Sequence, residues 1–272
     1  MGRPSRRTAI RQTDAVRYAE LTPQSLARTL SERPVAIWPI GALEWHGSHL
    51  PLGLDGLVAE AFAERLQDRV GGVLLPTYWH PITTLPHPMS LDVATDTFRS
   101  LFRRTAIGLG KAGVRVLCVV TGHYAQGHSL ELFELAEEFN RSAQELNVVA
   151  AAPLEPLENE ALLDHAGRWE TAQLLALRPD LVALSELPTD LHPKRDAVLG
   201  DDPRLAKAEE AETFWREAES VWERWIEKAL NGDLEELTSF YVRRKNHYQP
   251  YVAKHFRESW DQAIQDWWAS LS

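Results

Sequence analysis

The chain has 272 residues, 44% hydrophobic and 25% charged, which is typical of a soluble globular enzyme with one large domain or one domain and a modest appendage. Its formal net charge of −10 argues against a nucleic acid or an anionic membrane surface as the main partner. A lone cysteine, Cys118, cannot form an internal disulfide, and no apolar run approaches the about 18 residues of a membrane span, so we expect a cytoplasmic protein.

The first half of the chain alternates between predicted helices and short apolar runs. Residues 1–14 are basic, lack the apolar run of a signal peptide and are expected to form a mobile arm. A helix capped by Thr22, with Pro23 at its first position, comes next. The apolar runs are β-branched and nearly continuous, as in strands buried on both faces of a parallel sheet. They cover residues 35–40, 72–79, 114–120 and 148–154.

Helical patterns fill the intervals between these runs, at residues 57–70, 98–113 and 129–147. Strand and helix in this alternating order predict a layered α/β fold. In such folds, ligands gather beyond the carboxyl ends of the strands. Most of the histidines fall in the segments that follow the predicted strands: His46, His49, His80, His87, His123, His128 and His165.

The character of the chain changes after Asp202. Residues 203–230 are predicted to form a long amphipathic helix with an aromatic side, and residues 231–272 a helical C-terminal extension with a clear pattern at 259–271. Six of the ten tryptophans lie beyond residue 210, which favours a core or subunit-interface role, with a substrate-pocket wall as the alternative.

A carboxylate and an imidazole stand two positions apart after the first predicted strand. If the backbone is still extended there, Glu44 and His46 point to the same side and can bind one divalent ion. Asp55 opens the next helix, where it is either an N-cap or a ligand that bridges two ions.

The stretch that contains these three residues, PIGALEWHGSHLPLGLD, resembles the signature of the creatininase family. Two further blocks fit in the same order: VVTGHYAQGH resembles the family's N-G-H strand end, and DHAGRWET resembles its H-A-G-x-x-E-T segment. A weaker match is GDDPRLA, so the resemblance covers about residues 35–205. It implies a three-layer α/β/α domain with a mainly parallel sheet, assembled as a homohexamer around a small-molecule substrate.

The resemblance also implies one or two divalent ions (Zn²⁺, Mn²⁺ or Fe²⁺) held by Glu44, His46, Asp55 and His123. Ala125 stands where creatininase has a glutamate that binds the second ion. We therefore expect a first ion at Glu44, Asp55 and His123. The second ion, expected at His46 and Asp55, lacks that carboxylate and needs a donor from Glu170 or His128 in its place. A mononuclear site is the alternative.

Family members open a cyclic amide, remove a formyl group or cleave a small peptide. We accordingly predict a metal-dependent hydrolase of an amide-like C–N bond, acting through activated water. His165 is the expected proton shuttle, oriented by Asp164 or Glu170, and a capping or buried, hydrogen-bonded histidine is the alternative. The remaining candidates for substrate contact are Tyr124, Trp169, His80 and His87.

Other functions remain open from the sequence. Creatinine itself is not the expected substrate, since Ala161 and Asp164 differ from the creatininase pocket. The same metal chemistry would serve a C–C or lactone bond in a modified sugar or polyol, and a catalytically silent, metal-stabilised oligomer is a further alternative. The expected organisation is a metal-hydrolase domain over residues 15–230 followed by the extension.

Overall fold

The computed structural model describes residues 15–142 and 145–271, so the predicted arm at 1–14 lies outside the described residues. A parallel sheet runs through the middle of the molecule in the strand order β2-β1-β3-β4. The strands are β1 (Val35–Ile40), β2 (Val73–Leu74), β3 (Val116–Thr121) and β4 (Asn147–Ala151). Val35 pairs with Val116 and Ile40 with Thr121, which brings the carboxyl ends of β1 and β3 to the same edge.

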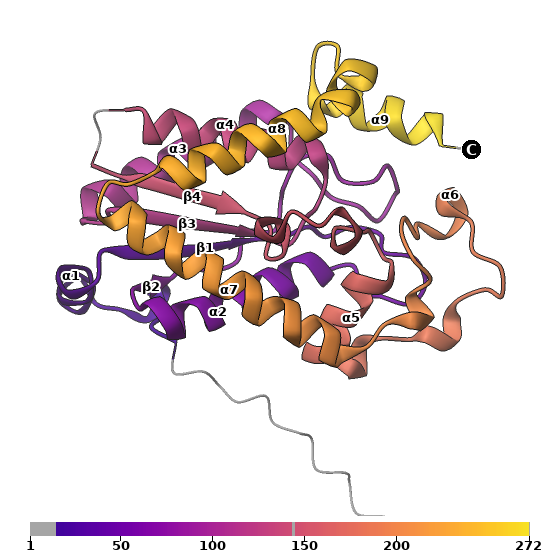
Figure 1. Ribbon diagram of the computed structural model, residues 1–272, viewed down its shortest axis with the longest axis horizontal. Coiled ribbons are helices and arrows are strands. Elements are labelled where there is room, and N and C mark those ends of the chain that lie inside the picture. The colour runs from indigo at the N-terminus through magenta and orange to yellow at the C-terminus, as the bar shows by residue number, and fades with distance from the viewer. Residues whose placement is uncertain (1–14, 143–144, 272) are drawn as a thin grey trace, which may run out of the picture.

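Helices cover both faces of this sheet (Figure 1). The α-helices are α1 (Pro23–Glu32), α2 (Leu54–Val70), α3 (Thr95–Ala112), α4 (Gln126–Asn140), α5 (Arg168–Leu177), α6 (Pro193–Asp196), α7 (Ala208–Leu230), α8 (Glu235–His255) and α9 (Trp260–Ser270). Short 3₁₀ helices occur at Tyr18–Glu20, Glu155–Leu157, Glu160–Leu162, Pro179–Leu181, Leu184–Glu186 and Pro203–Leu205.

Aromatic contacts show how the two helical layers pack. On one face, Trp38 of β1 contacts Phe102 of α3, with ring centroids 5.8 Å apart. On the other, Phe62 of α2 lies between Trp215 and Trp222 of α7, with centroids 6.1 Å from each. The three-layer α/β/α fold with a parallel sheet and a helical C-terminal extension is therefore confirmed.

Several predicted elements are shorter than the sequence indicated. The strand predicted at 72–79 is reduced to Val73–Leu74, because Pro76 has no N–H to give to the ladder, although the backbone N–H of Tyr78 still donates to the carbonyl of Pro39 at 3.0 Å. The helix predicted at 129–147 ends at Asn140. The side-chain amide of Asn140 accepts from the backbone N–H of Val148 at 2.7 Å and donates to its carbonyl oxygen at 2.9 Å, and so joins the end of α4 to β4.

The long helix predicted at 203–230 begins only at Ala208. Residues 203–205 form a 3₁₀ turn instead, capped by the Asp202 side chain. Helix α8 was not predicted as a separate element. None of the helices in the described part of the chain has an apolar stretch long enough to cross a bilayer.

Candidate metal centre

The loops that follow β1 and β3 meet the beginning of α2 at the carboxyl edge of the sheet. Two glycines allow this close approach: a Cβ at Gly122 would lie 2.0 Å from the carbonyl oxygen of Asp55, and one at Gly41 would lie 2.1 Å from the Cα of Gly56. Asp55 is therefore brought directly against the ends of both strands.

Glu44, Asp55 and His123 form the first group of potential ligands. His123 Nδ1 lies 3.0 Å from Glu44 Oε2 and 3.2 Å from Asp55 Oδ2, and all three side chains are buried. The potential ligand atoms of this group lie within 4.8 Å of one another. His123 is thus close enough to share one ion with Glu44 and Asp55, which lie about seventy residues or more earlier in the chain.

His46, Asp55 and Glu170 form the second group. His46 Nε2 lies 2.9 Å from Asp55 Oδ1 and 3.6 Å from Glu170 Oε2. Asp55 therefore presents one oxygen to each group. The N-cap alternative for Asp55 is not what the structure shows, because Gly53 occupies the N-cap position of α2 and neither Asp55 oxygen has a hydrogen-bond partner among the described residues.

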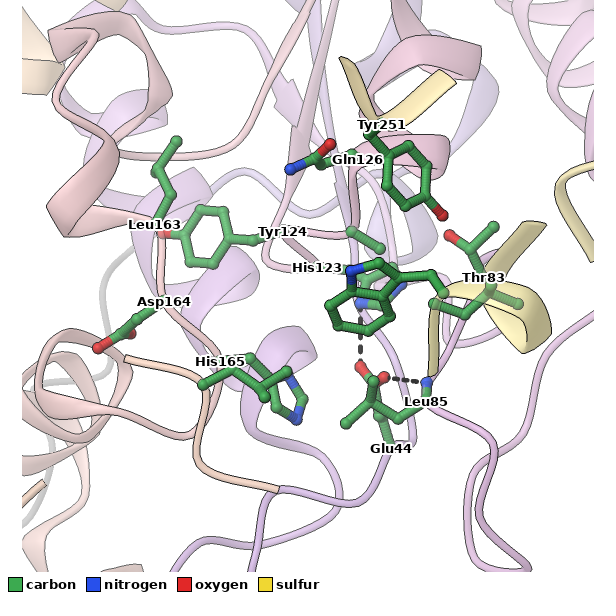
Figure 2. Close-up of a pocket in the computed structure, with 14 residues that line it drawn as sticks. Glu44, Thr83, Leu85, His123, Tyr124, Gln126, Leu163, Asp164, His165 and Tyr251 are labelled. Atoms are coloured by element: carbon green, nitrogen blue, oxygen red, sulfur yellow. Dashed lines mark hydrogen bonds and ion pairs between the residues drawn. The ribbon is translucent and has the colours of Figure 1, made fainter. Parts of the chain in front are cut away.

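Neighbouring backbone groups orient these ligands. Nδ1 of His46 lies 3.0 Å from the carbonyl oxygen of Glu44, and Nε2 of His123 lies 3.1 Å from that of Ile82. If those nitrogens carry the protons, His46 Nε2 and His123 Nδ1 are left with lone pairs that face the carboxylates. The backbone N–H of Leu85 donates to Glu44 Oε1 (Figure 2).

The pKa values of Glu170 and His46 reflect the concentration of carboxylates in the second group. Burial, together with Asp55 and Asp164, raises the pKa of Glu170 well above its usual range, despite the opposing effect of His46. Although burial alone would lower it, the pKa of His46 is raised to about 10, because Asp55 and Glu170 lie beside it. Both shifts have the same cause: several carboxylates share one buried space, in which a cation would stabilise their charged forms.

A divalent cation fits this set of donors. Glu44 Oε2, His46 Nε2 and both oxygens of Asp55 are buried and have no hydrogen-bond partner among the described residues. Such atoms are costly to bury unless an ion or a hydrogen bond satisfies them. Mixed oxygen and nitrogen ligands suit Zn²⁺, Mn²⁺ or Fe²⁺.

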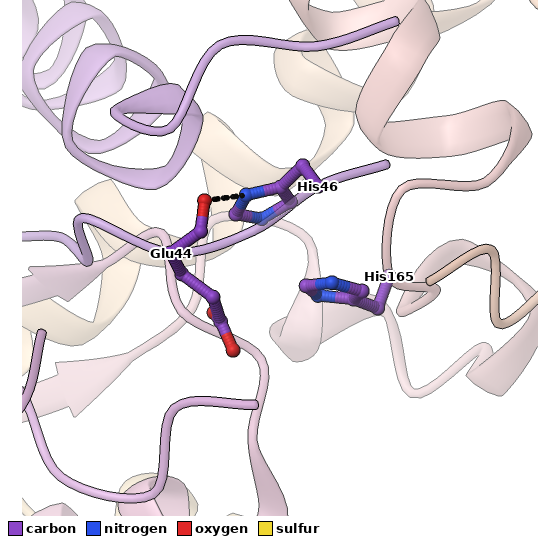
Figure 3. A group of neighbouring side chains, drawn as sticks. All are labelled: Glu44, His46 and His165. Atoms are coloured by element: carbon purple, nitrogen blue, oxygen red, sulfur yellow. Dashed lines mark hydrogen bonds between the residues drawn. The ribbon is translucent and has the colours of Figure 1, made fainter. Parts of the chain in front are cut away.

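His165 lies beside His46 of the second group (Figure 3), and it lines a cavity that opens next to the ligand groups. Its ring stacks on that of His46, with centroids 4.4 Å apart, and its Nε2 lies 3.0 Å from the carbonyl oxygen of Trp45. Burial, and then the neighbouring His46, lowers the pKa of His165 to about 4, so its ring is neutral at physiological pH. With Glu44 and His46 it also forms a third group of potential ligands.

Asp164 has a different position from the one expected for an orienting partner of His165. Its carboxylate accepts hydrogen bonds from the backbone N–H groups of Trp169 at 2.9 Å and Glu170 at 3.1 Å, at the beginning of α5. Burial raises the pKa of Asp164 to about 7. It holds the first turn of α5, and through it Glu170, whereas Trp45 is the hydrogen-bond partner of the His165 ring.

His128, the other suggested donor to a second ion, lies behind the first group. Its Nε2 is 3.1 Å from the hydroxyl oxygen of Thr121, and it belongs to none of the ligand groups found among the described residues. Of the two suggested donors, Glu170 is therefore the one that lies within a group of potential ligands.

A cavity of about 150 Å³ opens beside the first ligand group (Figure 2). Tyr124, expected to contact substrate, lines it. The other expected contacts do not: Trp169 is buried against Phe214, His80 is exposed beside Tyr78, and His87 stacks on Trp45 at 4.3 Å.

The last helices contribute to this cavity in a way that the sequence patterns did not predict. Tyr251, Ile264 and Trp267 line it. The concentration of tryptophans beyond residue 210 was the available signal, and a pocket wall was only the alternative interpretation of it. Trp215, Trp222 and Trp225 are indeed buried in the core.

Comparison with known proteins gives the same family throughout. The family model described as Creatininase: Creatinine amidohydrolase matches residues 19–226. A creatinine amidohydrolase of Pseudomonas putida is 30% identical over 191 residues, which cover 59% of this chain and 71% of that protein.

Solved structures share the fold. A crystal structure of creatininase superposes with a TM-score of 0.68 at 22% identity, covering 80% of this chain and 98% of that one. A structure named creatininase Mn gives 0.66 at 23% identity, with 79% and 99% covered. Together with the buried ligand groups, the family match identifies a metal-dependent amidohydrolase that uses a divalent metal. The family model matches well over half of the residues of this chain, and the chain therefore belongs to the creatininase family.

Proposed function

We propose that this enzyme hydrolyses the amide-like C–N bond of a small molecule, such as a cyclic amide or a formamide, at the ligand groups centred on Asp55. The observation that carries the proposal is the placement of Asp55 between two buried ligand groups that adjoin a cavity. Creatinine, named for the Pseudomonas putida relative, is not our proposed substrate, because part of the cavity wall comes from helices beyond residue 226, where the family match ends.

Two ions are proposed at this centre. Glu44, Asp55 and His123 would hold the first, and His46, Asp55 and Glu170 the second. Glu170 then takes the part of the carboxylate that Ala125 lacks. A divalent ion held there supplies a Lewis acid that activates water at neutral pH and polarises a carbonyl group.

His165 is the proposed carrier of the proton. An amide nitrogen is a poor leaving group unless it is protonated, so a group in the cavity must deliver a proton to it. With its Nε2 beside the carbonyl of Trp45, the neutral ring of His165 has a lone pair on Nδ1 that can accept a proton from water and pass it on. Tyr124, whose hydroxyl group lies 3.4 Å from the side-chain amide of Gln173, is proposed as a substrate contact.

The assembly of the enzyme is proposed from the family resemblance, and its location from its composition. A homo-oligomer, hexameric by resemblance to the family, is expected, and light scattering on the purified protein tests it. A cytoplasmic location stays a prediction, as does the division into a catalytic part at 15–230 and an extension at 231–272.

The function is tested by metal analysis and a hydrolysis screen on protein purified without chelator and supplied with Zn²⁺, Mn²⁺ or Fe²⁺. The screen covers cyclic amides, formamides, small peptides, lactones and cyclic diketones. We expect turnover of at least one amide, and Asp55→Asn should lose the metal and reduce that turnover by about 10³-fold or more. Asp68→Asn, on the exposed side of the same helix, is the matched control.

Three outcomes would contradict the proposal. Undiminished amide hydrolysis by Asp55→Asn would move the reaction away from this centre. Turnover of lactones or diketones without any amide would favour the alternative bond class. Metal-loaded protein with no hydrolysis above the free-metal background would favour a silent oligomer.

A further inference from the structure

The C-terminal extension supplies one wall of the cavity beside the metal centre. Tyr251 projects from α8, and Ile264 and Trp267 project from α9, into a cavity whose other lining residues include Glu44 and His123. In Figure 2, Tyr251 lies across the cavity from Leu163 and Asp164. All three wall residues lie beyond residue 226, so the family match accounts for the ligand groups but not for this wall.

Helix α9 is fixed over the cavity at its first turn. The indole N–H of Trp260 donates to Glu131 Oε2 at 3.2 Å, and its ring packs on Phe256 with centroids 4.4 Å apart. The ring also lies so close to α4 that a Cβ at Gly127 would be 2.9 Å from it. The Ser259 hydroxyl group caps the helix by accepting from the backbone N–H of Gln262 at 3.2 Å.

The far end of α9 is held by two further contacts. Lys194 Nζ, from α6, lies 3.4 Å from the carbonyl oxygens of both Ala269 and Leu271. The ring of Trp268 meets the ring of Trp45 edge-on, with centroids 6.4 Å apart. Trp45 stands between two proposed ligands in the sequence, so α9 is positioned directly against the metal-binding loop.

The two sides of the cavity differ in chemistry. One side presents the carboxylate of Glu44 and the imidazoles of His123 and His165, and the extension presents an indole, a phenol ring and a branched aliphatic side chain. A cavity of about 150 Å³ is large enough for one ring of the size of benzene. A flat apolar group would stack on the indole while a polar group attached to it reached the ligands.

We propose that α9 determines substrate specificity: Trp267, supported by Ile264 and Tyr251, binds a planar ring or another flat apolar group next to the scissile amide. The inference rests on the proposed function, because the metal centre must hold the amide end. Substrates are then amides that carry such a group, and small aliphatic amides are poor substrates.

A pair of chelators tests this without knowledge of the substrate. Acetohydroxamate and benzohydroxamate offer a metal the same two oxygens and differ in a methyl against a phenyl group. Their Kd values for zinc-loaded protein are measured by isothermal titration calorimetry. We expect benzohydroxamate to bind at least about tenfold more tightly, since the ring is buried and stacks on the indole.

Substitutions then assign the preference to one side chain. Trp267→Ala should reduce the ratio of the acetohydroxamate Kd to the benzohydroxamate Kd to less than about threefold, while the Kd of acetohydroxamate stays unchanged. Trp267→Phe should restore most of this ratio. Gln262→Ala, on the exposed side of α9, should leave both values unchanged. Circular dichroism and bound zinc verify that each variant is folded and loaded.

The outcomes separate the two proposals. Equal affinity for the two hydroxamates in the wild type, or an undiminished preference in Trp267→Ala, overturns the specificity role of α9 and leaves the metal centre standing. If the protein retains no zinc, the proposed metal centre is refuted and the inference falls with it. If neither hydroxamate binds to zinc-loaded protein, the cavity does not admit a ligand beside the metal, and the specificity role of α9 is overturned while the metal centre stands.

Discussion

The two oxygens of Asp55 face different histidines, Oδ1 towards His46 and Oδ2 towards His123. A carboxylate can bridge two ions in this arrangement, and a shared ligand would make the two proposed ion sites depend on each other. What distinguishes one ion from two is then the remaining carboxylate of the second group, Glu170.

Glu170→Gln should reduce the bound metal from two ions to one per chain. The amide oxygen of glutamine is a weaker ligand than a carboxylate, while it can still accept the backbone N–H of Ala166, which Glu170 Oε2 accepts at 2.6 Å. Elemental analysis after gel filtration gives the stoichiometry. Glu186→Gln, at an exposed position, should keep both ions, and two ions retained in Glu170→Gln would point to another ligand.

His165→Asn should lower kcat by about 100-fold or more and leave the metal content unchanged, because a proton carrier is lost and no ligand is removed. Steady-state kinetics on the amide found in the screen, together with metal analysis, distinguishes the two roles. A loss of metal would instead make His165 a ligand, in the group it forms with Glu44 and His46. His80→Asn, exposed and outside the cavity, is the control.

At the scale of elements, α8 is joined to the core by a buried ion pair. Arg244 Nε lies 3.2 Å from Glu155 Oε1, and the hydroxyl group of Tyr248 donates to the same oxygen at 3.0 Å. Both charged side chains are almost fully buried, at 3% and 1% exposure. The neighbouring pair of Arg243 and Glu158 is exposed instead, at 53% and 35%.

This contrast gives a matched prediction for the extension. Arg244→Ala should lower the free energy of unfolding by about 3 kcal/mol, because it leaves the Glu155 carboxylate buried without its cation. Arg243→Ala should cost less than about 1 kcal/mol, as exposed ion pairs contribute little. Urea denaturation followed by circular dichroism measures both, and similar losses in the two variants would contradict the assignment.

Strand and helix patterns predicted the elements that build the sheet, since β1, β3 and β4 are buried on both faces and read as apolar runs. Helix α8 could not be recognised in the same way. Its buried side includes Arg244 and Tyr248, whose burial depends on Glu155, about ninety residues earlier in the chain. The hydrophobic periodicity of a segment does not indicate a partner that is distant in the sequence.

The site residues that could be predicted are those placed by the order of the strands. Glu44 and His123 follow adjacent parallel strands, so their convergence is a consequence of the topology. The placement of Trp267 beside them depends on how the last helix packs across the molecule, which no spacing in the sequence encodes. Asp164, adjacent to His165 in the sequence, bonds to the backbone of α5 because that helix begins beside it.

For the whole molecule, buried carboxylates make folding and metal binding depend on each other. Zinc at a hundred times its Kd should add about 2.7 kcal/mol to the free energy of unfolding and raise the Tm by about 5 °C. Thermal denaturation of chelator-treated protein, before and after zinc is returned, measures this shift. Asp55→Asn should show none, and an identical Tm of wild-type protein with and without zinc would argue against a bound ion.

The contribution of α9 to the cavity has a consequence for how such an enzyme changes. The proposed metal ligands all precede residue 171, whereas Tyr251, Ile264 and Trp267 come after residue 250. The proposed ligands and the aromatic wall proposed to select the substrate are thus encoded in separate stretches of the gene. Randomising those three codons alone should yield libraries with new preferences and an intact catalytic apparatus, a route open equally to natural divergence and to enzyme engineering.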